Sequence, residues 1–295
     1  MKKYITILAA VVAMVACQKE DKGLSQVGDG QMRFEFGINV TKATATAFEA
    51  GDEVALFAVE RTSADEAPEL QIAGNFLNNE KIIYNGEAWA SVRTLYWGAN
   101  AGDFYALYPY QKLTSVKEQV FEVAMDQNTA ETEESLGGYE ASDLLWAKTE
   151  NAAQADGTVA MQFKHLMSKC VVTLTKGETF EGDIPDDIVT HIYNTTTTAK
   201  LNFAKGSVEK DGTGNRRTIT MKKINNERFE AIVVPQKIER STPLIEITMG
   251  GIAYLLEHSL SFKPGYVHTI NLTLNTSPDQ EKFEIKLDAE VDDWN

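Results

Sequence analysis

The chain has 295 residues, a formal net charge of −15 and only two cysteines. Phosphate backbones repel so acidic a surface, and nucleic acid is therefore excluded as a partner by charge. Two cysteines supply no disulfide framework, so a packed apolar core must stabilise the fold.

Residues 1–16 are typical of a secretory signal. Lys2 and Lys3 precede an apolar run that ends at Ala16, which is shorter than the ~20 residues that a membrane-spanning helix needs. A small residue directly before Cys17 is typical of a lipoprotein signal peptidase site. We therefore expect Cys17 to be acylated and to anchor the chain in outer-membrane lipid. The alternative is a soluble secreted protein in which Cys17 is incidental.

The residues after Cys17 indicate where the lipoprotein goes. Lys19, Glu20 and Asp21 resemble the signature that sends Gram-negative lipoproteins to the outer face of the outer membrane. Residues 17–29 contain two glycines and few apolar side chains, so they predict an acylated N-terminus and flexible tether. Loss of Lys2 and Lys3 with the signal changes the formal charge from −15 to −17. The lipid on Cys17, rather than a basic surface patch, would then hold the protein at its membrane.

A long alternating run follows the tether. Its apolar side chains recur at every second position, which is the period of a half-buried strand. They are Met32, Phe34, Phe36, Ile38 and Val40. A small polar segment that contains Lys42 separates this run from the next predicted strand, 54–59.

Short strand-like segments separated by turn residues continue to the C-terminus. In the first half they are 81–84, 88–96, 103–110 and 116–125, with a hairpin predicted at Asn85-Gly86. Residues 150–158 lack large side chains and mark a boundary between expected domains 30–156 and 157–295. In the second domain the expected strands are 159–165, 166–174, 188–193, 199–203, 217–221, 229–234, 244–249, 253–256, 266–274 and 283–291. This pattern predicts an all-β protein with a sandwich or barrel in each half.

No catalytic, cofactor or metal site is expected. The histidines lie in separate segments without metal-ligand spacing, and Cys170 lies among apolar residues like a small buried hydrophobe. The four histidines are His165, His191, His258 and His268. Calcium binding by the turn 211–215 is an alternative that the sequence leaves open, although a plain hairpin turn is favoured. A surface hydrolase with a convergent site also stays open.

A series of short motifs runs through almost the whole mature chain. In order they are Phe48-x-x-Gly51-Asp52-x-Val54, Phe104-Tyr105-Ala106-x-Tyr108-Pro109, Asp143-Leu144-Leu145-x-Ala147, Phe163-x-His165-x-x-Ser168, Pro235-Gln236, Pro264-Gly265-x-x-x-x-Ile270 and Trp294. Their order and spacing resemble the fimbrillin family of lipoprotein fimbrial subunits, also called type V pilins.

The resemblance implies two tandem transthyretin-like β-sandwich domains after the lipoprotein signal peptide. It also implies assembly by donor-strand addition, in which a trypsin-like protease cuts after the first strand and a strand of another fimbrial subunit fills the groove. The family's cut follows a basic residue, arginine in many relatives, and corresponds to Lys42-Ala43 here; Arg33 lies inside the predicted strand. The released strand would carry Met32 to Val40. The candidate donor residues are Phe283, Ile285, Leu287, Ala289 and Val291, although this run could instead complete the second sandwich.

The expected function is therefore a non-enzymatic, surface-anchored fimbrial subunit or adhesin that contacts host or bacterial surface glycans or proteins. The alternative is a monomeric glycan-binding lipoprotein, whose aromatic rings would form one open platform. The rings concerned are Trp89, Trp97, Trp146, Tyr105, Tyr108 and Tyr110.

Overall fold

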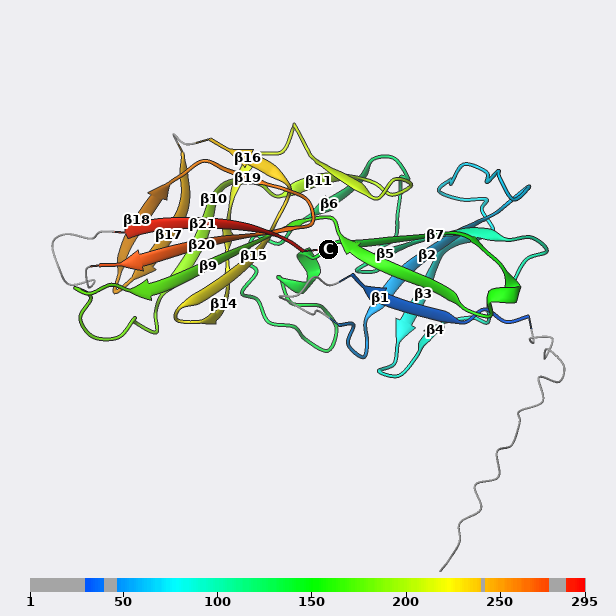
Figure 1. The fold of residues 1–295 in the computed structure, drawn as a ribbon, viewed down its shortest axis with the longest axis horizontal. Coiled ribbons are helices and arrows are strands. Elements are labelled where there is room, and N and C mark those ends of the chain that lie inside the picture. Colours follow the sequence, from blue (N-terminus) through cyan, green and yellow to red (C-terminus); the bar gives the residue numbers. More distant parts are fainter. Residues whose placement is uncertain (1–29, 40–46, 240–241, 276–284, 295) are drawn as a thin grey trace, which may run out of the picture.

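The computed structural model describes residues 30–39, 47–239, 242–275 and 285–294 (Figure 1). Several predicted site residues lie outside these ranges, and their expected roles stay predictions. They are Cys17, Lys19, Glu20, Asp21, Val40, Lys42, Ala43 and Phe283.

Seven strands of the first half form a closed barrel with the order β1-β4-β3-β2-β5-β7-β8. They are β1 (Phe34–Ile38), β2 (Glu53–Glu60), β3 (Leu77–Tyr84), β4 (Trp89–Ser91), β5 (Gly102–Tyr108), β7 (Leu145–Ala152) and β8 (Val159–His165). The hairpin predicted at Asn85-Gly86 is confirmed, since β3 pairs with β4 across it and Gly86 has the positive φ of 96° that favours glycine there. The barrel occupies one end of the elongated molecule (Figure 1).

The second half contains two larger sheets, with the orders β13-β10-β17-β18 and β14-β15-β9-β20-β21. Their strands are β9 (Ser168–Lys176), β10 (Val189–Thr196), β13 (Arg216–Thr220), β14 (Lys222–Asn225), β15 (Arg228–Val233), β17 (Pro243–Met249), β18 (Ile252–Glu257), β20 (Tyr266–Leu274) and β21 (Ile285–Asp293). Two small sheets, β12-β11-β6 and β16-β19, complete the fold. Their strands are β6 (Gln119–Glu122), β11 (Thr198–Asn202), β12 (Ser207–Lys210), β16 (Gln236–Ile238) and β19 (Leu260–Phe262).

The all-β class is confirmed. Within the described residues the helical segments are two single turns of 3₁₀ helix, η1 (Glu140–Ser142) and η2 (Gln154–Asp156). No helix in the described part of the chain is long and apolar enough to cross a membrane. The strand pairing does not follow one cut at residue 156, because β6 pairs with β11 and β8 belongs to the barrel. Strand β6 therefore pairs with a strand of the second half before β7 and β8 complete the barrel.

The two halves share packing through strands that are buried on both faces. Along β2, Val54, Leu56 and Ala58 face the barrel core, whereas Ala55, Phe57 and Val59 face a second core that continues to the C-terminal sheets. Alternate residues of a strand point to opposite faces, so one apolar run supplies both cores. The ring of Phe57 meets that of Phe203, after β11, with 5.1 Å between the centroids.

Replacing Phe57 with alanine should lower the free energy of unfolding by about 3–5 kcal/mol, because it removes a fully buried ring from the shared core. Tyr96→Ala is the control, since Tyr96 is 59% exposed and its loss should change stability by at most about 0.5 kcal/mol. Urea denaturation measures both changes. Similar small losses in the two variants would contradict a core shared by the two halves.

Candidate functional site

The first strand, β1, closes the barrel, and its two sides are paired unequally. One side pairs in parallel with β8 over five positions, from Phe34↔Val159 to Ile38↔Phe163. Further backbone bonds extend this ladder: the Asn39 N–H donates to the Phe163 carbonyl at 2.8 Å. Within the described residues, β4 pairs with β1 only at Phe34↔Trp89. The residues just before β1 are also bonded on this second side, since the Met32 N–H donates to the Leu95 carbonyl at 2.8 Å and the Trp97 N–H donates to the Gly30 carbonyl at 2.9 Å. The β8 side therefore holds β1 itself, and the other side holds the residues before it.

The side chains of β1 fill the barrel core at alternate positions. Met32, Phe34 and Phe36 are buried, and Ile38 packs against the same core. The ring of Phe36 lies 4.9 Å from that of Trp89 and 5.7 Å from that of Phe163. Phe48, from the first motif of the resemblance, packs on the same two rings. Without residues 32–38 this core would lose three buried side chains and β8 would lose its ladder with β1, a combination that favours binding of another apolar strand.

The C-terminal strand β21 lies at the edge of the five-stranded sheet and pairs with β20 over nine positions, from Tyr266↔Asp293 to Leu274↔Ile285. Of the candidate donor residues, Phe283 lies outside the described range and Val291 is 46% exposed. Ile285, Leu287 and Ala289 lie in the strand. The pairing agrees with the alternative that this run completes the second sheet of its own chain.

A buried polar cluster joins the barrel to β21. His165 Nδ1 lies 2.8 Å from Asp143 Oδ1, and the His165 ring stacks on Trp294 with 3.6 Å between the centroids and 9° between the planes. His165 ends β8 and Trp294 follows β21, so the stack connects the last barrel strand to the C-terminus. These three residues belong to separate motifs of the resemblance, and the structure brings them together.

The cluster continues through a buried ion pair. Lys169 Nζ lies 2.7 Å from Glu230 Oε2, and both side chains are at most 10% exposed. The Tyr139 hydroxyl donates to the same carboxylate at 3.0 Å, and Arg228 binds its other oxygen. Burial opposes ionisation of Glu230, but Lys169 and Arg228 outweigh it and hold the pKa of this carboxyl below its usual value. Sequence reasoning missed this pair because its members lie on different strands.

The other histidines and Cys170 have structural surroundings. His268 Nε2 accepts a hydrogen bond from the Lys263 N–H at 2.9 Å, and burial lowers the pKa of His268 to about 4. Cys170 is buried, as predicted, and burial raises the pKa of its thiol to about 12. In the described ranges, no three His, Cys, Asp or Glu side chains gather as metal ligands. In the turn at 211–215, Asp211 Oδ1 accepts hydrogen bonds from the Thr213 N–H and hydroxyl. The predicted hairpin is wrong, because the flanking strands do not pair with each other: β12 pairs with β11, and β13 pairs with β10.

The aromatic residues considered for a glycan platform do not form one. Trp89, Trp146, Tyr105 and Tyr108 are all less than 10% exposed, and Trp97 and Tyr110 are half-buried. Tyr108 donates from its hydroxyl to Asp52 Oδ1 at 2.9 Å, within the motif series. Among the described aromatic side chains, the exposed ones are Phe76 and Tyr96. Core packing, the stronger of the two interpretations, is confirmed for the four buried rings.

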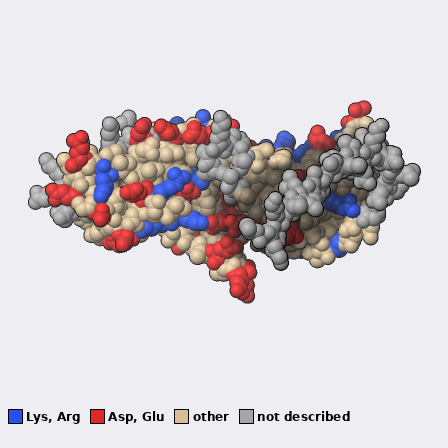
Figure 2. All heavy atoms as spheres, turned by 60° about the horizontal axis from the view of Figure 1, so that its bottom comes forward, with Lys and Arg blue, Asp and Glu red and all other residues tan. Residues whose placement is uncertain are grey.

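An acidic hollow of about 840 Å³ lies beside Tyr108 and Pro109. One lysine, Lys81, lines it against seven carboxylates, and Figure 2 shows acidic side chains gathered near the middle of the molecule. The seven are Glu49, Asp52, Glu53, Glu131, Glu133, Glu134 and Glu140. Burial raises the pKa of Asp52, against the opposing effect of its hydrogen bonds.

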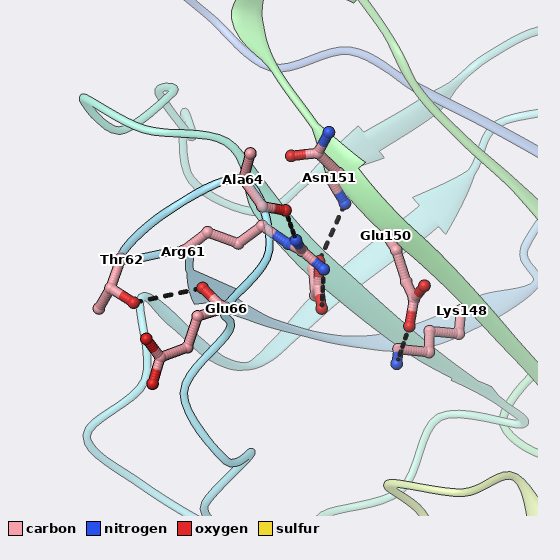
Figure 3. A network of polar contacts seen from close by, with 8 residues as sticks. Arg61, Thr62, Ala64, Glu66, Lys148, Glu150 and Asn151 are labelled. Carbon is pink, nitrogen blue, oxygen red and sulfur yellow. Dashed lines mark hydrogen bonds and ion pairs between the residues drawn. The ribbon is translucent and has the colours of Figure 1, made fainter.

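A second polar network, at the other end of the barrel strands, is structural. The Arg61 guanidinium donates to Asp103 Oδ1 at 2.7 Å, and the Asn151 N–H donates to the same oxygen at 2.9 Å (Figure 3). The pairing of β5 with β7 shifts register between Gly102 and Phe104, and Asn151 has a φ of 56°. The Asp103 carboxylate thus fixes an irregular strand end and the loop after Arg61, and this network contains no exposed reactive group.

Residues 41–294 match the family model described as Fimbrillin-like. The chain belongs to the Fimbrillin-like family. Strand β1 lies just before the matched residues. The family consists of structural fimbrial subunits at the cell surface, not of enzymes, and membership supports a fimbrial subunit that interacts with other subunits. No curated protein matches the chain.

Solved structures share the fold. A candidate cell adhesion protein from Bacteroides uniformis matches with a TM-score of 0.65 and 21% identity, over 91% of this chain and 99% of that one. A candidate cell adhesion protein from Bacteroides ovatus matches with a TM-score of 0.64 and 16% identity, over 90% and 97%. At these identities the similarity shows that the chain shares its fold with these two proteins.

Glu230→Gln should lower the free energy of unfolding by about 3–5 kcal/mol near neutral pH, because it leaves the buried charge of Lys169 without its partner. The wild-type advantage is fully present above the pKa of an unfolded-chain glutamate, about 4.3, and is lost as pH falls through the lower pKa of the folded protein. The two proteins should therefore converge in stability in acid. Urea denaturation across pH measures this.

The control for that experiment is Glu150→Gln, which breaks the pair of Glu150 with Lys148 on the surface; the Glu150 side chain is 60% exposed. Its effect should stay below about 1 kcal/mol at any pH. An effect of Glu230→Gln no larger than this, or one that does not depend on pH, would contradict a stabilising ion pair at the junction.

Proposed function

We propose that the protein is a surface-anchored fimbrial subunit that assembles by donor-strand addition and mediates cell adhesion. Membership of the Fimbrillin-like family supports a fimbrial subunit. The observation that carries the finer proposal is the geometry of β1, a short strand that fills the barrel core with alternate side chains and pairs along its length with β8, while its other side is bonded only from Phe34 back to Gly30 within the described residues. A strand of a second subunit can replace such a strand residue for residue, since backbone pairing supplies affinity and the pockets supply specificity.

The trigger in this proposal is cleavage at Lys42-Ala43, which would separate β1 from the rest of the chain. The segment lies after Asn39 and before Ala47, between β1 and β2. Arg33, the nearest arginine, is a poorer target, because its carbonyl accepts the Val159 N–H at 2.8 Å beside β8. Cleavage at Lys42 would leave Met32 to Asn39 held in the barrel by non-covalent contacts alone.

The donor in this proposal is the C-terminal run from Phe283 to Val291. Strand β21 is an edge strand, so its departure would leave the other four strands of its sheet paired to one another. A central strand could not leave at so small a cost, because it holds two ladders. The proposal places the subunit on the outer membrane through acylated Cys17, after export directed by Lys19, Glu20 and Asp21. Its adhesion ligands would be glycans or proteins of host or bacterial surfaces.

A disulfide between β1 and β8 tests strand release. Glu35 pairs with Ala160, and both are exposed, so cysteines there leave the core untouched. Paired strands lie about 4.8 Å apart, within the usual Cα separation for a disulfide. Cells that carry Glu35→Cys/Ala160→Cys should yield few fibres when the bond is oxidised and recover them when it is reduced, and sheared-fibre yield measures this.

The matched control is Lys200→Cys/Glu209→Cys, an exposed pair that joins β11 to β12 and leaves β1 free. It should yield fibres in both redox states. Native Cys170 should not interfere, because it is buried and burial raises the pKa of its thiol. Unchanged fibre yield with β1 covalently locked would reject release of this strand.

A further inference from the structure

Trp294, directly after the C-terminal strand β21, adds a buried side chain to the backbone pairing of that strand with β20. Asp288, Glu290, Val291, Asp292 and Asp293 are all exposed. Trp294, directly after the strand, is 3% exposed. Among the side chains described at this end of the chain, it is therefore Trp294 that is buried in the core.

Contacts with three segments fix Trp294. Its ring stacks on His165 at 3.6 Å, and Lys169 Nζ lies 5.9 Å from the ring centroid. Its backbone N–H donates to the Gly265 carbonyl at 2.8 Å, and the Gly265 N–H donates to the Met167 carbonyl at the link between β8 and β9. The end of β21 is thereby joined to the last barrel strand and to the starts of β9 and β20.

The slot that holds the ring is partly polar. His165 is bonded to Asp143, and Lys169 to Glu230, so two of its walls are groups that water can solvate. Indole Nε1 is buried, and no acceptor in the described part of the chain bonds to it. Stacking and the nearby cation favour the bound ring, whereas an unpaired buried donor opposes it. Because favourable and unfavourable contributions to the free energy of the bound ring oppose each other, the contact of Trp294 with its slot can open.

We propose that Trp294 is a latch, an autoinhibitory contact that keeps β21 docked on its own chain until the ring leaves the slot formed by His165 and Lys169. Its functional meaning rests on the proposed role of β21 as donor. While the latch is closed, β21 is occupied by β20 and the subunit cannot offer it. When the ring leaves, the strand keeps a ladder on one side, with a free edge on the other.

Hydrogen exchange on the full mature chain tests the latch without any need for assembly. Trp294→Ala should speed exchange of the β21 amides at least about tenfold, since it removes an aromatic stack and a buried ring, and it should leave the β2 and β5 amides of the barrel unchanged. Trp294→Phe, which keeps a ring for His165, should stay close to the wild type. Val291→Ala is the matched control on the exposed side of the same strand.

Unchanged exchange in β21, or equal acceleration in the barrel, would overturn the latch. The latch would also be overturned if Trp294→Phe accelerated exchange of the β21 amides as much as Trp294→Ala does. The aromatic stack on His165 would then contribute nothing to holding the strand. Fibre yield from the same variants separates this inference from the proposed function. If Trp294→Ala opens β21 and fibres form no faster, the latch stands and the donor role fails.

Discussion

The arrangement of this protein depends on how the barrel is closed. Six barrel strands are joined by their own pairings, but the ring closes only through β1, which contributes Phe34 and Phe36 to the core, follows the buried Met32 and pairs with β8 along its length. Apolar pockets and an unpaired ladder are costly in water, so a strand of this alternating kind must occupy the site. Which chain supplies the strand is not fixed by that requirement. The requirement therefore suits both a monomer and a polymer.

The second constraint is that the first described strand and the residue after the last one both contact β8. Strand β8 pairs with β1 and ends at His165, whose ring stacks on Trp294 at the end of β21. The ion pair of Lys169 with Glu230 lies beside the same ring and stabilises the junction only as a pair, since either charge alone would be buried without compensation. The strand proposed to leave and the strand proposed to donate thus meet the same barrel strand or its end.

Local sequence pattern predicted much of the fold, because alternation and turn chemistry act over a few residues. The alternation from Met32 to Ile38 located β1, and Asn85-Gly86 located the hairpin of β3 and β4. Pattern could not predict that β6 pairs with β11, because the choice of a distant partner depends on the whole fold. It could not predict the contact of Asp143 with His165 either, although the family resemblance contained both residues. The expected sites at Cys17 and Lys42 lie outside the described residues and stay predictions.

The central claim is that the first strand is removed and replaced, and the mass of the subunit in its native assemblies tests this most directly. Intact-mass analysis would compare the protein from outer membranes with that from sheared surface fibres. The account predicts a chain in fibres that begins near Ala43 and has lost Cys17 and β1. A chain that keeps a lipidated Cys17 and never occurs in fibres would contradict it.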